Sequence, residues 1–172
     1  IDADLGLQGS DLRAAERTFQ LMRQVAGRAG RAEAPGEALL QTYQPEHSVI
    51  RAILAGDEEA FWAAEAGERR QAGVPPYGRM AGIILSGPSA DQVFDLGNAM
   101  ARQDMPLRKI GAQVYGPAPA PIARIRGRHR VRLLVKADKQ APLQQALAEW
   151  AGQFRLSTNL RLSIDIDPQS FY

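Results

Sequence analysis

The sequence predicts an α+β fold, and three observations support that class. Residues 160–166 alternate apolar and polar side chains, which is the period-two pattern of a strand with one buried face. Residues 142–154 place Leu143, Leu147 and Trp150 on one face of a helix. Hydrophobic residues make up 45% of the 172-residue chain, which is enough for one domain, or one domain and part of another, to bury a core.

The N-terminal part is predicted to be mostly helical. Apolar spacing predicts helices over 11–26, 48–55 and 57–70, with a strand over 37–43. The glycines of the turn Gly27–Arg31 are expected to stop the first helix, and Asp57 is expected to cap the third. Residues 45–76 are interpreted as a helical connector, because Pro75-Pro76 is the strongest break in the chain.

Residues 77–172 are predicted to form a compact C-terminal module. Strands are expected over 80–86, 130–136 and 160–166, and helices begin near Ser89 and Pro142. Residues 114–116 and 122–126 are expected to be extended on either side of the proline-rich segment 117–121. The order is therefore β-α-β-β-α-β. This order is typical of the ferredoxin-like arrangement, in which four antiparallel strands carry two helices on one face.

Composition excludes several classes of protein. The chain has no cysteine, which removes disulfides, thiol catalysis and cysteine-based zinc sites, and with two histidines no metal site is predicted. No apolar run approaches the ~20 residues of a membrane-spanning helix. The first residue is Ile1, and the opening segment does not resemble a signal peptide, so we expect a piece of a larger protein.

The segment Gln24–Arg31 is the sharpest local motif. Its glycines permit close backbone approach, and Arg28 and Arg31 can neutralise charge on a transferring phosphoryl group. The sequence has no Walker-type phosphate loop, so a nucleotide would need a partner lobe. The alternative is a plain helix C-terminus, where arginines are favoured by the helix dipole.

A second motif is a run of arginines at every other position. Its members are Arg124, Arg126, Arg128, Arg130 and Arg132. In an extended chain residues two apart share a face, so we expect a cationic ribbon, with Val131, Leu133 and Val135 toward the core. Such a ribbon attracts phosphates or the carboxylates of an acidic peptide. The alternative is a solvated strand face that resists aggregation.

Several motifs together resemble one family of enzymes. Residues 12–31 resemble the last conserved motif of superfamily 2 helicases, in the form found in the primosomal protein N′ family of replication-restart helicases. Further similar segments follow in the same order, at 41–47, 68–77, 116–121, 126–130 and 165–168. The resemblance thus covers essentially the whole chain.

The resemblance implies a parent enzyme that uses ATP and Mg to unwind DNA at stalled forks. Residues 1–44 would be the end of its second helicase lobe, a remnant of an α/β lobe, and residues 77–172 its C-terminal domain. Arg28 and Arg31 are implied to act as arginine fingers, with Gln24, Gly27 and Gly30 beside the nucleotide. The zinc of the family has no ligands in this sequence. No cofactor and no ATP hydrolysis are expected from this piece alone.

The resemblance also implies partners. These are forked DNA, the acidic C-terminal tail of the single-stranded DNA-binding protein and other primosome proteins. The implied location is the bacterial cytoplasm, in association with the nucleoid, and no membrane partner is implied. Arg128 and Arg132 are expected to reach the terminal carboxylate of that tail.

Two other interpretations of the sequence stay open. One is a stand-alone ferredoxin-like nucleic-acid-binding module, in which the turn Gly27–Arg31 only contacts a phosphate. The other is an RNA-binding fold of the same topology, although its usual aromatic pair is not found on the expected central strands. Trp62 and Trp150 are expected to pack rather than to stack on bases, and nothing distinguishes Tyr77 from Tyr115 as a stacking residue.

Overall fold

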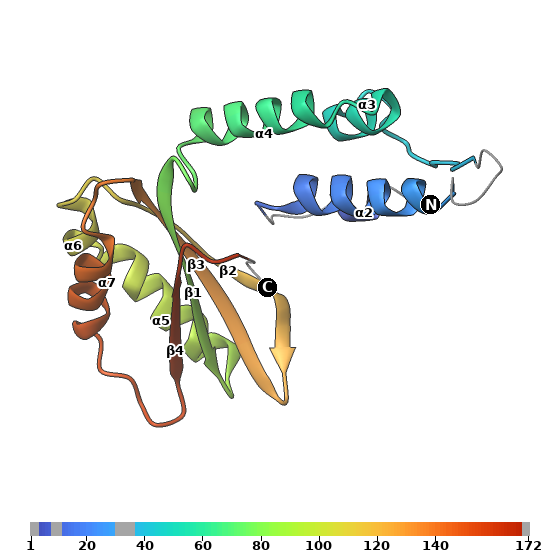
Figure 1. Ribbon diagram of the computed structural model, residues 1–172. Coiled ribbons are helices and arrows are strands. Elements are labelled where there is room, and N and C mark those ends of the chain that lie inside the picture. Colours follow the sequence, from blue (N-terminus) through green and yellow to red (C-terminus); the bar gives the residue numbers. More distant parts are fainter. Residues whose placement is uncertain (1–3, 8–11, 30–36, 170–172) are drawn as a thin grey trace. The chain divides into compact units, whose positions relative to one another are not determined.

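A computed structural model describes residues 4–7, 12–29 and 37–169 of the chain (Figure 1). The chain divides into two compact units, residues 1–68 and residues 69–172. Within the described residues, no helix is both long enough and apolar enough to cross a bilayer.

The first unit is helical. Its elements are α1 (Asp4–Leu7), α2 (Ala14–Ala29), α3 (Ser48–Ala55) and the first part of α4 (Glu58–Ala72). The ring of Phe19 on α2 stacks on Phe61 of α4 with centroids 4.0 Å apart, and Val49 of α3 is buried in the same cluster. The residues predicted as a connector therefore pack against the helix that carries the Gly-Arg motif.

Two local predictions for this unit are wrong. Helix α2 does not stop at Gly27 but continues to Ala29, because one helical glycine costs only about 1 kcal/mol and the helix around it contains alanines. Residues 37–43 do not form a strand, and Gln41 alone makes a bridge. A strand needs neighbours, and no strand of the described residues pairs with this segment.

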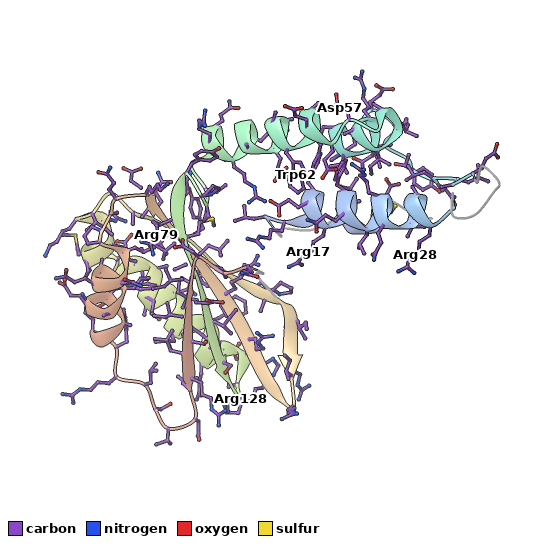
Figure 2. All side chains as sticks on the ribbon, in the orientation of Figure 1. Arg17, Arg28, Asp57, Trp62, Arg79 and Arg128 are labelled. Atoms are coloured by element: carbon purple, nitrogen blue, oxygen red, sulfur yellow. The ribbon has the colours of Figure 1, made fainter. Side chains whose placement is uncertain are left out.

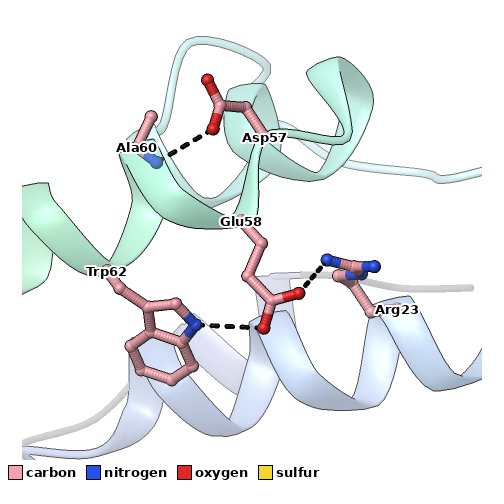
Figure 3. A network of polar contacts seen from close by, with 5 residues as sticks. All are labelled: Arg23, Asp57, Glu58, Ala60 and Trp62. Carbon is pink, nitrogen blue, oxygen red and sulfur yellow. Dashed lines mark hydrogen bonds and ion pairs between the residues drawn. The ribbon is translucent and has the colours of Figure 1, made fainter.

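The start of α4 is fixed by side chains, as Figure 3 shows. Asp57 caps the helix, as predicted, by accepting a hydrogen bond of 2.9 Å from the backbone N–H of Ala60. Glu58 accepts a hydrogen bond of 3.2 Å from the indole of Trp62 and pairs with Arg23 of α2. These contacts join α4 to α2 at the surface of their aromatic cluster.

The second unit is a four-stranded antiparallel sheet with helices on one face (Figure 1). Its strands are β1 (Gly78–Gly87), β2 (Gln113–Ile125), β3 (Arg128–Asp138) and β4 (Arg161–Ile166), in the order β2-β3-β1-β4. Its helices are α5 (Ala90–Arg102), the short unpredicted α6 (Met105–Arg108) and α7 (Leu143–Gly152). The predicted α+β class is confirmed.

The core of this unit follows from strand alternation. Val131, Leu133 and Val135 are buried on the face that the helices cover, as predicted, and they oppose Leu85, Ile83 and Ala81 of β1. Trp150 of α7 is fully buried, and its indole donates a hydrogen bond of 3.1 Å to the backbone carbonyl of Met100. Each large apolar side chain in this layer contributes about 1.5–3 kcal/mol by leaving water. Within the second unit, no described helix lies on the opposite face of the sheet, here called the open face.

Candidate nucleic-acid and partner interface

The arginine run lies in the hairpin between β2 and β3. Ile125 pairs with Arg128, so Arg126 and Gly127 form a two-residue turn. Both have positive φ, 48° and 77°, which is the backbone of a type I′ turn and matches the twist of the two strands. The turn places Arg124 and Arg126 at the exposed tip of the hairpin.

The five arginines do not share one face, so that part of the prediction is wrong. Arg128, Arg130 and Arg132 alternate along β3 on the face opposite the core. Arg124 pairs with His129, which has the parity of the core-facing residues of β3, and the register is irregular between Pro119 and Arg124. The chain reverses at Arg126, and period-two parity does not continue through a turn and an irregular strand.

Arg128 is engaged within the protein, at the hairpin end of the sheet (Figure 2). Its Nη2 donates hydrogen bonds of 2.8 Å to the backbone carbonyls of Ser86 and Asn159, and its Nε is buried without a hydrogen-bond partner. These bonds connect the start of β3 to β1 and to the residue two before β4. The hydrogen bonds of the Arg128 guanidinium thus stabilise this end of the sheet.

The other arginines of the run differ in their surroundings. Arg130 is half-buried and donates a bond of 3.3 Å to the carbonyl of Ile122, in the irregular part of β2. Arg132 is half-buried one step further along β3. No hydrogen bond or ion pair joins the side chain of Arg124 or Arg126 to any residue that the structure describes. The tip of the hairpin is therefore the part of the run with the least internal engagement.

The register identifies a further arginine that the sequence analysis did not single out. Ser86 of β1 pairs with Arg130 on one side and with Arg161 of β4 on the other, so the three residues form a row across the sheet. Directly paired residues point to the same face, which is the open face here. Alternation within 160–166 indicates that Arg161 is exposed, but its alignment with Arg130 depends on long-range pairing.

The Gly-Arg motif lies on α2 of the first unit. Gln24 and Arg28 are four residues apart and exposed, so they are neighbours on one side of the helix. Figure 2 shows Arg17 and Arg28 on the side of α2 that is turned away from α3 and α4. A shallow hollow of about 420 Å³ lies along this side, lined by Arg17, Gln20, Leu21 and Gln24. Gly30 and Arg31 lie outside the described residues.

The nucleotide expected from the resemblance fits this exposed side chemically. Gln24 and Arg28 offer donors that phosphate oxygens accept, and a Cβ on Gly27 would meet no atom within 4 Å. Gly27 is thus helical and open, rather than part of a tight turn. Within the described ranges, no three acidic, histidine or cysteine side chains come together as metal ligands.

These observations define the chain first by class. It is an α+β protein whose second unit has a sheet with one helix-covered face and one open face, bordered by a cationic hairpin. Comparison with known families then gives a closer assignment. Residues 70–169 match the family described as primosomal protein N C-terminal domain, and the chain belongs to that family.

Curated relatives support the same assignment. The chain is 41% identical over 172 residues to the replication restart protein PriA of Rickettsia felis, covering 100% of this chain and 26% of that protein. It is 35% identical to the protein of that name from Treponema pallidum, over 96% of this chain and 25% of the relative. The chain is 32% identical to the relative of that name from Bacillus subtilis, over 98% of this chain and 21% of the relative. The chain therefore spans about a quarter or less of the relatives' length.

Proposed function

We propose that the chain is the C-terminal part of an ATP-dependent DNA helicase that restarts stalled replication forks in the bacterial cytoplasm, near the nucleoid. The observation that carries this proposal is its similarity, along the whole chain, to relatives named replication restart proteins. The ferredoxin-like interpretation of the second unit and the exposed hairpin tip support a role in holding forked DNA and other primosome proteins.

In the parent enzyme, Arg28 and Arg31 are proposed as arginine fingers, with Gln24 and the two motif glycines beside the nucleotide. The exposure of Gln24 and Arg28 on one side of α2 supports this role. The chain itself should not hydrolyse ATP, because it has no phosphate loop to hold the nucleotide. The rate of ATP hydrolysis by the chain in the presence of DNA should equal the rate of a blank without protein, and a higher rate would contradict this proposal.

DNA binding is proposed to start at the hairpin tip. Arg124 and Arg126 are exposed, and removing a phosphate contact lowers both the affinity and its dependence on salt. The intact chain should bind a forked DNA more tightly than a linear duplex, with a steep loss of affinity as salt rises. The double variant Arg124→Ala, Arg126→Ala should weaken fork binding roughly tenfold or more.

A stand-alone nucleic-acid-binding module is the alternative function. Such a module should prefer a single strand, or one particular sequence, to a fork. Equal affinity for forked and linear DNA, measured by fluorescence anisotropy at one salt concentration, would favour it over the restart role.

The acidic tail of the single-stranded DNA-binding protein is proposed as a second ligand of the hairpin. Arg128 and Arg132 lie on the same face of β3, with Arg130 between them in the alternating register. The double variant Arg128→Ala, Arg132→Ala should weaken binding of an acidic tail peptide, and unchanged affinity would end this assignment. Because Arg128 also donates hydrogen bonds to two backbone carbonyls, Arg132→Ala alone is the variant that leaves these bonds intact.

A further inference from the structure

We propose that the open face of the sheet binds the single-stranded arm of a fork, through Arg130 and Arg161 on either side of Ser86 and through the ring of Tyr115. This inference rests on the proposed function, and it specifies which part of the forked DNA is bound and which residues bind it. Neither Arg161 nor Tyr115 belongs to the arginine run.

The first part of the argument is the cationic row. Strand spacing puts the Cα atoms of Arg130 and Arg161 about 10 Å apart, with the small side chain of Ser86 between them. The row therefore presents two arginines and a serine on one face of the sheet. No hydrogen bond or ion pair engages the side chain of Arg161 with any residue in the described part of the chain, and the side chain of Arg130 uses one of its five donors internally.

Acidic residues on the same face lie too far away to neutralise this row. Asp165 of β4 is paired with Gly82, four residues along β1 from Ser86. That separation is about 13 Å, which is longer than the Debye length of about 8 Å at physiological salt. The field above the row is thus positive and attracts phosphate.

The second part of the argument is an exposed aromatic ring on the same face. Tyr115 of β2 pairs with Leu134, which alternates with Arg132 and Arg130 on the face opposite the core. Tyr115 is 48% exposed, and its hydroxyl donates a hydrogen bond of 2.6 Å to the side chain of Gln113, which holds the ring in place. Aromatic rings beside cationic grooves bind single strands by stacking on their bases.

The surface between the row and the ring suits a single strand better than a duplex. Most of the intervening residues on this face are small or apolar, namely Gly82, Ile84, Ala118, Leu134 and Ser163. Arg132, which is paired with Ala118 and Ile84, adds a positive charge among them. Bases lie against such a surface, while phosphates remain near the guanidiniums. An acidic peptide uses the arginines but has no base to stack on Tyr115, and so the observations favour DNA.

The test is fluorescence anisotropy of the intact chain with a labelled oligothymidine of about 20 nucleotides. Arg161→Ala should weaken binding roughly fivefold to tenfold and lower the salt slope by about 0.7, the value for one phosphate contact on a single strand. Tyr115→Ala should weaken binding roughly tenfold with an unchanged salt slope, and Tyr115→Phe should retain most of the affinity. Arg102→Ala is the matched control, because it removes an equal charge from an exposed position of α5, on the other side of the sheet.

Each outcome decides the proposal. Losses with Arg161→Ala and Tyr115→Ala that exceed the loss with Arg102→Ala support it. Affinities equal to that control overturn it, and so does a loss of acidic-peptide binding with oligothymidine binding intact. If fork binding needs Arg124 and Arg126 but not Arg161, this inference fails and the proposed function stands. If the chain binds no DNA, both fail.

Discussion

At the scale of single residues, Arg128 shows how one side chain of a charged run can serve the fold. Its guanidinium donates to the carbonyls of Ser86 and Asn159, which are otherwise distant in sequence. Hydrogen bonds from a charged donor contribute about 1.5–3 kcal/mol, and loss of the donor leaves the acceptors to water. The residue thus stabilises the surface on which its neighbours are displayed.

Arg128→Ala should lower the free energy of unfolding of the second unit by about 1–3 kcal/mol. Urea unfolding followed by the fluorescence of buried Trp150 measures this change. Arg124→Ala is the matched control, because Arg124 is exposed and its removal should change stability by no more than about 0.5 kcal/mol. Equal stabilities of the two variants would show that the carbonyl bonds contribute nothing.

The charge of Asp4 contributes to the stability of the first unit. Its carboxylate accepts hydrogen bonds from the hydroxyl of Thr42, at 2.6 Å, and from the N–H of Tyr43, at 2.7 Å. These bonds, the Thr42 bond first, hold the pKa of Asp4 below its ordinary value of 3.8. The ionised form is therefore favoured by folding, so its contribution is present above pH 3.8 and is lost as the pH falls through the lowered pKa.

Asp4→Asn should destabilise the first unit at neutral pH and make little difference at a pH below the lowered pKa of Asp4. Urea unfolding followed by Trp62, in a Trp150→Phe background, reports on this unit. If the difference in stability between the parent chain and the Asp4→Asn variant does not depend on pH, the carboxylate charge has no role.

At the scale of elements, the glycines differ in whether the surrounding structure leaves space for a Cβ atom. A Cβ on Gly67, within α4, would meet no atom within 4 Å, so Gly67→Ala should stabilise the helix by roughly 0.5–1 kcal/mol. A Cβ on Gly78, at the start of β1, would lie 2.1 Å from the carbonyl oxygen of Gly73. Gly78→Ala should destabilise the second unit by about 1–3 kcal/mol. Thermal unfolding by circular dichroism compares the two, and effects of the same sign would contradict this account.

Local patterns were sufficient to predict most elements of the second unit. The alternation of Leu162, Ile164 and Ile166 predicted β4, and the helical spacing around Trp150 predicted α7. Pairing between strands was not accessible in the same way, because it depends on residues far apart in the chain. The alignment of Arg161 with Arg130 across Ser86 is of this kind, as is the change of face between Arg124 and Arg128.

The first unit was predicted less well for a related reason. Helix α2 continues through Gly27 because the high helix propensity of the alanines around it offsets the low propensity of one glycine. A prediction based on the glycine alone leaves out this contribution. The segment 37–43 has the apolar residues of a strand but no neighbouring strand of the described chain to pair with. The exposure of Gln24 and Arg28 agrees with the proposed nucleotide-facing side, whose role stays a prediction.

At the scale of the whole molecule, the two units have separate cores. The buried cluster of the second unit is drawn from residues 81–166, and the aromatic cluster of the first unit is drawn from α2, α3 and α4. A sheet of four strands with helices on one face contains enough buried apolar surface to fold by itself. Residues 69–172, produced alone, should therefore keep the fold that they have in the full chain.

This expectation is tested by comparing unfolding of residues 69–172 with unfolding of the full chain. The shorter piece should unfold cooperatively, with a Trp150 transition within a few degrees of the one in the full chain, since its core is complete. Leu133→Ala in the same piece should lower stability by about 2–5 kcal/mol, which confirms that the transition reports on the sheet core. If residues 69–172 show no cooperative transition, the second unit depends on the first for its stability, and DNA contacts assigned to the sheet would have to be studied in the full chain alone.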